Sequence, residues 1–133
     1  MLHKLPMGRC EKILVVEDNE DIRDGLSTML DDHGYIIETA ADGREALQKL
    51  KLATVPTLVL LDLMMPKMDG WQFLSARKDD PQLAIHKVVT VSAVDRTQWA
   101  GASAVPEPDA SLSKPIDLEQ LWDVVSRFCD ETP

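Results

Sequence analysis

The chain has 133 residues, a formal net charge of −9 and 44% hydrophobic residues, which is the balance of one globular domain with a single core. The acidic excess argues against direct binding to nucleic acid, which needs a basic face, and against an anionic membrane surface. No run approaches the roughly 20 apolar residues of a membrane span, and residues 1–9 lack the apolar segment of a signal peptide.

The chain carries two cysteines, Cys10 and Cys129. They form neither a metal-ligand spacing nor the framework of a disulfide-rich domain. We therefore expect two reduced, partly buried thiols and a cytoplasmic protein.

Short apolar runs alternate with amphipathic ones along the chain. Runs rich in branched aliphatic residues predict buried strands over residues 12–16, 35–39, 57–61, 87–91 and, briefly, 110–112. Helical spacing of apolar residues predicts helices over residues 21–32, from Asp42 to before Pro56, after Gly70, and from 118 to 129. Between 95 and 108 the pattern is least clear, because Gly101, Pro106 and Pro108 leave room only for a short helix that ends before Val105.

Five strand–helix units in succession predict an α/β fold. A parallel sheet covered by helices on both faces, with right-handed crossovers, is the economical arrangement, which makes the sheet doubly wound. We expect one domain over residues 10–131, preceded by a short tail at residues 1–9.

Polar residues follow the predicted strands at their carboxyl ends, where doubly wound sheets place their sites. The set consists of three carboxylates, a hydroxyl and an ammonium group: Glu17, Asp18, Asp62, Ser92 and Lys114. Carboxylates and waters suit Mg²⁺, which also grips phosphate oxygens, and a carboxylate can become an aspartyl phosphate. Lysine and a hydroxyl can then bond the phosphoryl oxygens.

Each of these residues also has an ordinary structural explanation. Glu17 and Asp18 could only cap the next helix, because acidic side chains favour a helix amino end. Asp62 could be a loop residue, and the Lys114–Pro115 pair is common in turns. The joint occurrence at successive strand ends favours the phosphoacceptor interpretation.

The chain resembles the receiver domain of bacterial response regulators, the CheY-like proteins of two-component signalling. The resemblance covers roughly residues 10–131 and rests on four motifs, which read ILVVEDN from residue 13, LLDLMMPKMDG from residue 60, VSA from residue 91 and SKP from residue 113. It implies a five-stranded, flavodoxin-like parallel sheet of order 2-1-3-4-5.

The resemblance also assigns roles to the individual positions. It implies that Asp62 is phosphorylated with Mg²⁺ bound, that Asp18 is a direct metal ligand and that Glu17 acts on the metal through water. The backbone carbonyl of Met64 would complete the protein ligands. Ser92 would bond a phosphoryl oxygen, and Lys114 would pair with the phosphoryl group.

Two features depart from the family pattern. The usual switch aromatic, three residues before the lysine, is Ser111 here, and the segment of the family's fourth helix contains Pro106 and Pro108. Both belong to the face that the family uses for output, so the phosphorylation chemistry is better supported than the conformational readout.

The resemblance implies a phosphoacceptor and not an enzyme in the ordinary sense, although it would phosphorylate itself from small donors and lose the group slowly. The donor would be a sensor histidine kinase or a phosphotransfer protein, because none of His3, His33 and His86 resembles a phosphodonor. Output would occur by protein contact, with a downstream partner that the sequence does not name. The chain could also be a fragment of a larger regulator or of a hybrid histidine kinase.

Three other functions compete with the phosphoacceptor interpretation. A haloacid-dehalogenase-like phosphotransferase needs an acid two residues after its nucleophile, where this chain has Met64. A flavodoxin-like cofactor binder needs Ser, Thr and Gly in the first loop, where this chain has acids. A degenerate receiver that serves only for docking is disfavoured by the complete acid set, Ser92 and Lys114, although Ser111 leaves room for it.

Overall fold

The computed structural model describes residues 10–63, 70–93 and 107–129. Five parallel strands form one sheet in the order β2-β1-β3-β4-β5. They are β1 (Lys12–Val16), β2 (Ile37–Ala40), β3 (Thr57–Asp62), β4 (Lys87–Ser92) and β5 (Ala110–Ser113). The predicted fold class and strand order are confirmed.

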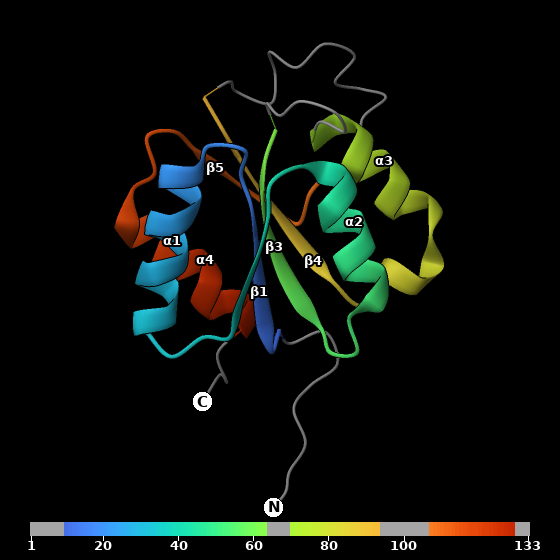
Figure 1. The fold of residues 1–133 in the computed structure, drawn as a ribbon, viewed down its shortest axis with the longest axis horizontal. Coiled ribbons are helices and arrows are strands. Elements are labelled where there is room, and N and C mark those ends of the chain that lie inside the picture. The colour runs from blue at the N-terminus through green and yellow to red at the C-terminus, as the bar shows by residue number, and fades with distance from the viewer. Residues whose placement is uncertain (1–9, 64–69, 94–106, 130–133) are drawn as a thin grey trace, which may run out of the picture.

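Helices cover both faces of this sheet. They are α1 (Glu20–Asp32), α2 (Gly43–Leu52), α3 (Gly70–Asp79) and α4 (Leu118–Cys129), together with a short 3₁₀ helix η1 (Pro81–Leu83). Figure 1 shows α1 and α4 on one side of the sheet and α2 and α3 on the other. No described helix is both long and apolar enough to traverse a bilayer.

The first two helices begin at side-chain caps. The Asn19 side chain accepts a hydrogen bond from the Ile22 amide at 3.0 Å, and Asp42 accepts one from the Glu45 amide at 2.9 Å. Glu45 in turn accepts from the amide of Ala41, the residue before this cap, at 2.9 Å, so both side chains help to hold the start of α2. These caps turn the chain from a strand into a helix at the carboxyl edge of the sheet.

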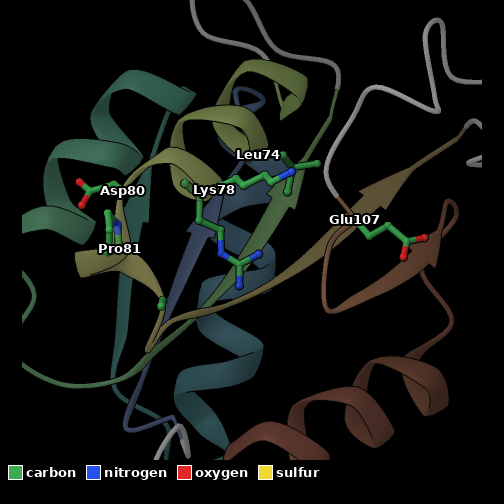
Figure 2. A pocket seen from close by; sticks show the side chains of 7 residues that line it. Leu74, Lys78, Asp80, Pro81 and Glu107 are labelled. Atoms are coloured by element: carbon green, nitrogen blue, oxygen red, sulfur yellow. The ribbon is translucent and has the colours of Figure 1, made fainter.

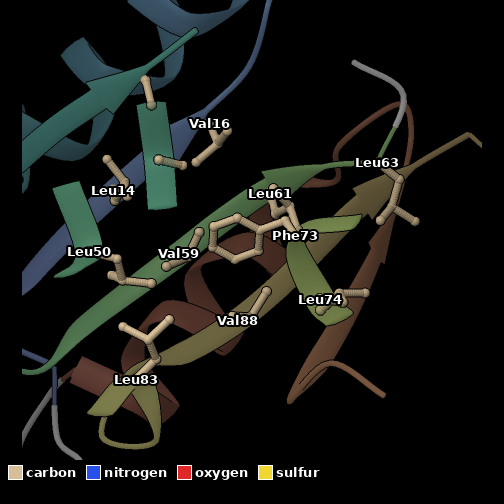
Figure 3. Close-up of a cluster of buried hydrophobic side chains, with 12 residues drawn as sticks. Leu14, Val16, Leu50, Val59, Leu61, Leu63, Phe73, Leu74, Leu83 and Val88 are labelled. Atoms are coloured by element: carbon tan, nitrogen blue, oxygen red, sulfur yellow. The ribbon is translucent and has the colours of Figure 1, made fainter. Parts of the chain in front are cut away.

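The two faces of the sheet contribute to two separate apolar clusters. The cluster shown in Figure 3 joins alternate residues of β1, β3 and β4 to α2, α3 and η1, with Phe73 fully buried. The other cluster includes Ile13, Leu58 and Val89 from the sheet, with Leu121 and Val125 from α4. Alternation along the central strands therefore fills both layers, which explains their continuous apolar runs.

Some element details differ from the sequence expectation. The second strand begins at Ile37 rather than at residue 35, and η1 was not anticipated, although Asp80 before Pro81 is a recognisable helix start. Ile22 and Leu118, two apolar residues within the predicted helices, are 43% and 49% exposed. Both lie in the first turn of a helix.

The cysteine expectation was wrong. Cys10 and Cys129 form a disulfide in the structure, with Cα atoms 4.4 Å apart. The two residues are separated by 119 positions in the sequence, so only the fold brings them together. The predicted tail at residues 1–9 and most of the uncertain 95–108 segment lie outside the described residues.

Candidate functional site

Three carboxylates meet where β1 and β3 end. Glu17 and Asp18 directly follow β1, and Asp62 is the last residue of β3. Each can offer one carboxylate oxygen such that the three oxygens lie within 4.8 Å of one another. Glu17 and Asp62 are buried, whereas Asp18 is exposed. The predicted acidic cluster is thus brought together with one side open to solvent.

Lys114 reaches this cluster from beyond β5. Its Nζ atom lies 3.5 Å from Oδ2 of Asp62 and 3.7 Å from Oε1 of Glu17. The amide of Lys114 also donates to the carbonyl of Ser92 at 2.9 Å, which fixes the lysine backbone against the end of β4. The ammonium group thus lies near two of the three clustered carboxylates, and the site keeps an acidic excess suited to a cation.

The loop after β1 is held by residues that the sequence analysis did not single out. The guanidinium of Arg23, one turn into α1, donates from Nη1 to the carbonyl of Glu17 at 2.8 Å. The amide of Asn19 donates to Oε2 of Glu17 at 3.1 Å. An arginine on the face of the helix that follows an acidic loop is the signal that could have found this support.

Burial raises the pKa of Glu17 to about 7, and the negative charge of Asp62 adds to the rise. The hydrogen bond from the Asn19 amide and the positive charge of Lys114 act in the opposite direction. Desolvation outweighs these stabilising contacts because Glu17 is only 4% exposed. A cation in the cluster would favour the charged form of Glu17.

Ser92 ends β4 beside this cluster. It is 5% exposed, and in the sheet register Val91 lies opposite Asp62 while Ser92 lies opposite Ser113. The register thus places Ser92 at the same edge as the carboxylates and Lys114. Met64, the predicted carbonyl ligand, lies outside the described residues.

The arrangement combines a buried carboxylate, a set of oxygen donors that suits a hard cation, and a cationic side chain. Carboxylate oxygens fit Mg²⁺, which takes few protein ligands and retains waters that phosphate oxygens can replace. A cation held by these oxygens and the Lys114 ammonium could together neutralise the oxygens of a phosphoryl group brought next to Asp62.

A cavity of about 490 Å³ lies elsewhere, beside the carboxyl end of α3, η1 and Glu107 (Figure 2). Two of its polar residues serve the fold: Arg77 donates to Asp109 at 2.9 Å and to the His86 carbonyl at 3.0 Å, and Asp80 caps η1. It contains none of the clustered carboxylates, so it is not the candidate site.

The chain is similar in sequence to known receiver domains and response regulators. The family model of the response regulator receiver domain matches residues 13–126. The response regulator MprA of Mycolicibacterium vanbaalenii is 40% identical over 114 residues, which cover 83% of this chain and 46% of that protein. The chain therefore spans about half the length of this regulator.

Two solved structures are also similar. The receiver domain of a signal transduction histidine kinase from Syntrophus aciditrophicus has a TM-score of 0.79 at 28% identity, covering 90% of this chain and 89% of that one. The response regulator TrrA of Thermotoga maritima, solved with Mg²⁺ and BeF, has a TM-score of 0.73 at 29% identity, covering 89% and 98% of the two chains. With the family model matched over most of its length, this chain belongs to the response regulator receiver domain family of two-component signalling.

Proposed function

We propose that this domain accepts a phosphoryl group on Asp62 in the presence of Mg²⁺ and passes the signal on through protein contact. One observation carries the proposal: the buried Asp62 carboxylate lies in a cluster with Glu17 and Asp18, and the Lys114 ammonium lies 3.5 Å from its Oδ2 atom. A carboxylate that lies beside both a cation site and a lysine can act as a nucleophile toward phosphorus.

The metal ligands would be Asp18 and Asp62 directly, Glu17 through water, and the backbone carbonyl of Met64. Mg²⁺ supplies neutralisation of the phosphoryl oxygens when it is bound. The contact between Arg23 and the Glu17 carbonyl would keep the acidic loop in position before the metal arrives. TrrA, which was solved with Mg²⁺ and BeF, supports this assignment by its similarity.

In the proposed transfer an oxygen of Asp62 forms a bond to phosphorus while the bond from phosphorus to the donor breaks. Lys114 would pair with the developing negative charge, and Ser92 would donate a hydrogen bond to a phosphoryl oxygen. Lys114 already lies near Asp62, so its charge would be in place before the transfer.

The donor would be a phosphohistidine of a sensor histidine kinase or of a phosphotransfer protein. The two described histidines of the chain support an outside donor: His33 caps the end of α1, and His86 is buried before β4. We assign the receiver domain to residues 10–131 and a short tail to residues 1–9. We also expect the protein to act in the cytoplasm. We include self-phosphorylation from small donors in this proposal and assign no direct contact with nucleic acid or membrane.

Acetyl phosphate with Mg²⁺ tests the proposal. We expect one added phosphoryl group, labile to hydroxylamine, on the peptide that contains Asp62. Asp62→Asn should remove it, whereas Asp123→Asn, which deletes an exposed acid on α4, should be labelled like the parent. Full labelling of Asp62→Asn would show that another residue is the nucleophile. No labelling of any protein would favour a receiver that serves only for docking.

A further inference from the structure

The cysteine pair joins the two ends of the described chain. Cys10 lies two residues before β1 and Cys129 is the last residue of α4, and the two form a disulfide. In Figure 1 the end of α4 lies near the start of β1, at the edge of the sheet away from the carboxyl ends of β1 and β3. The link is therefore remote from the acidic cluster.

The two cysteines are held together by more than the sulfur–sulfur bond. The amide of Cys10 donates to the carbonyl of Phe128 at 2.8 Å, and both side chains pack into the apolar cluster beneath α4. Leu121 and Val125 anchor the same helix in that cluster. With these contacts in place, two thiols would stay adjacent after reduction, and their high effective concentration would favour closing the bond again.

The two cysteines differ in their exposure to solvent. Cys10 is 5% exposed, whereas Cys129 is only partly buried at the end of its helix. Thiol–disulfide exchange requires the attacking thiolate to reach one sulfur in line with the bond, so access decides which sulfur is attacked. Cys129 is the more exposed residue of the pair, so we assign the attack to its sulfur.

We propose that Cys10 and Cys129 form a redox-active pair that exchanges with a small thiol of the glutathione class. A glutathione thiolate attacks the Cys129 sulfur, the Cys10–Cys129 bond breaks, and Cys10 leaves as a thiolate that takes up a proton. A second glutathione then attacks the mixed disulfide, releasing Cys129 as a thiol and oxidised glutathione. The reverse sequence restores the bond, and the pair thus loses or gains two electrons in total.

The bond controls how firmly the end of α4 is attached to β1. Reduction would leave the Cys10–Phe128 hydrogen bond and the apolar contacts as the remaining attachments of that last turn. The protein would then be less stable in its reduced form, since the crosslink no longer restricts the unfolded chain. The proposal does not depend on phosphoryl transfer.

The test equilibrates the full chain with mixtures of reduced and oxidised glutathione, blocks thiols by alkylation, and measures intact mass and thermal unfolding. We expect the oxidised chain to carry no alkyl group, the reduced chain to carry two, and the oxidised chain to melt roughly 10 °C higher. Trypsin should release residues 10–12 linked to residues 128–133 from the oxidised chain only. A parent chain that stays fully alkylated in excess oxidised glutathione would overturn the proposal.

The direction of attack is tested separately with the parent and two variants. Brief exposure of the oxidised parent to glutathione should place the mixed disulfide on the peptide of residues 128–133. Oxidised glutathione should modify Cys10→Ser at least tenfold faster than Cys129→Ser. Modification at residues 10–12 in the parent, or equal rates in the variants, would contradict the assignment to Cys129. The parent experiment decides the point even if one variant does not fold.

Discussion

The hydroxyl of Thr90 on β4 lies 2.9 Å from the hydroxyl of Ser111 on β5, its direct neighbour in the parallel register. Thr90 is 1% exposed, whereas Ser111 is exposed. Ser111 stands where receivers usually carry their switch aromatic. In this chain a hydrogen bond between two strands therefore occupies the position of a movable ring.

This hydrogen bond should show an asymmetric mutational cost. Ser111→Ala leaves the buried Thr90 hydroxyl without this contact and should cost about 1–3 kcal/mol of unfolding free energy. Thr90→Val leaves only an exposed hydroxyl, which water can satisfy, and should cost about 1 kcal/mol or less. Urea unfolding of both variants and of the double variant measures this. Equal costs for the two single changes would contradict the burial argument.

Magnesium should stabilise the folded domain through its acidic cluster. At a Mg²⁺ concentration ten times Kd the gain is about 1.4 kcal/mol, or roughly 4–7 °C in melting temperature. Asp18→Asn should raise the metal-free melting temperature, because it removes one of three adjacent like charges, and should abolish most of the Mg²⁺ effect. Thermal unfolding with and without Mg²⁺ measures both.

Asp123→Asn serves as the control for that experiment, because it removes one negative charge outside the cluster. It should keep the full response to Mg²⁺. If Asp18→Asn and Asp123→Asn responded equally, the cluster would not be the metal site.

His86 should make folding stability fall in mild acid. It is buried, its Nδ1 atom accepts from the Thr57 amide at 3.0 Å, and burial, followed by the charges of Arg77 and Lys12, lowers its pKa. Above pH 6.5 the side chain is neutral in both states. Below that pH His86 binds a proton in the unfolded chain but stays neutral in the folded chain. The free energy of unfolding therefore falls until the pH reaches the lowered pKa of His86 in the folded chain.

Glu17 opposes this trend, and the experiment must separate the two groups. The raised pKa of Glu17 gives stability that is complete below pH 4.5 and is lost as the pH rises through about 7. Urea unfolding between pH 7.5 and 5 in the Glu17→Gln background isolates His86, with a limiting slope of about 1.4 kcal/mol per pH unit. His86→Asn, which keeps an acceptor but does not titrate, should flatten that slope. An unchanged slope would exclude His86 as the cause.

The lifetime of the phosphorylated state should depend on Met64 and Val94, which lie outside the described residues. In receivers these positions, two beyond the phosphorylated Asp and two beyond the hydroxyl residue, can orient or block the attacking water. Neither side chain offers a useful hydrogen bond, so we expect slow self-dephosphorylation. Met64→Asn with Val94→Glu should speed the loss about tenfold or more, a change of roughly 1.4 kcal/mol in the barrier.

The loss of the phosphoryl group from the labelled protein after acetyl phosphate is removed measures this rate. The two single variants show whether the amide or the carboxylate matters more. A decay rate unaffected by the double change would mean that both side chains point away from the phosphoryl group and serve packing.

The sequence by itself predicted the α/β fold class and the residues of the acidic cluster, and its resemblance to receiver domains added the strand order. The central strands are short apolar runs that are buried on both faces. The strands β3 and β4 end at the site residues Asp62 and Ser92, and β1 and β5 end one residue before Glu17 and Lys114. Because parallel strands end at one edge, knowing the strand ends was enough to bring Glu17, Asp62 and Lys114 together.

Only the tertiary structure decided the contacts between residues far apart in sequence or hidden by ordinary patterns. The disulfide between Cys10 and Cys129 depends on α4 running back to the start of β1, a geometry that no local spacing encodes. The hydrogen bond from Arg23 to the Glu17 carbonyl depends on a rotamer. The pairing of Thr90 with Ser111 depends on the register between β4 and β5, where a shift of one residue would turn each side chain to the other face.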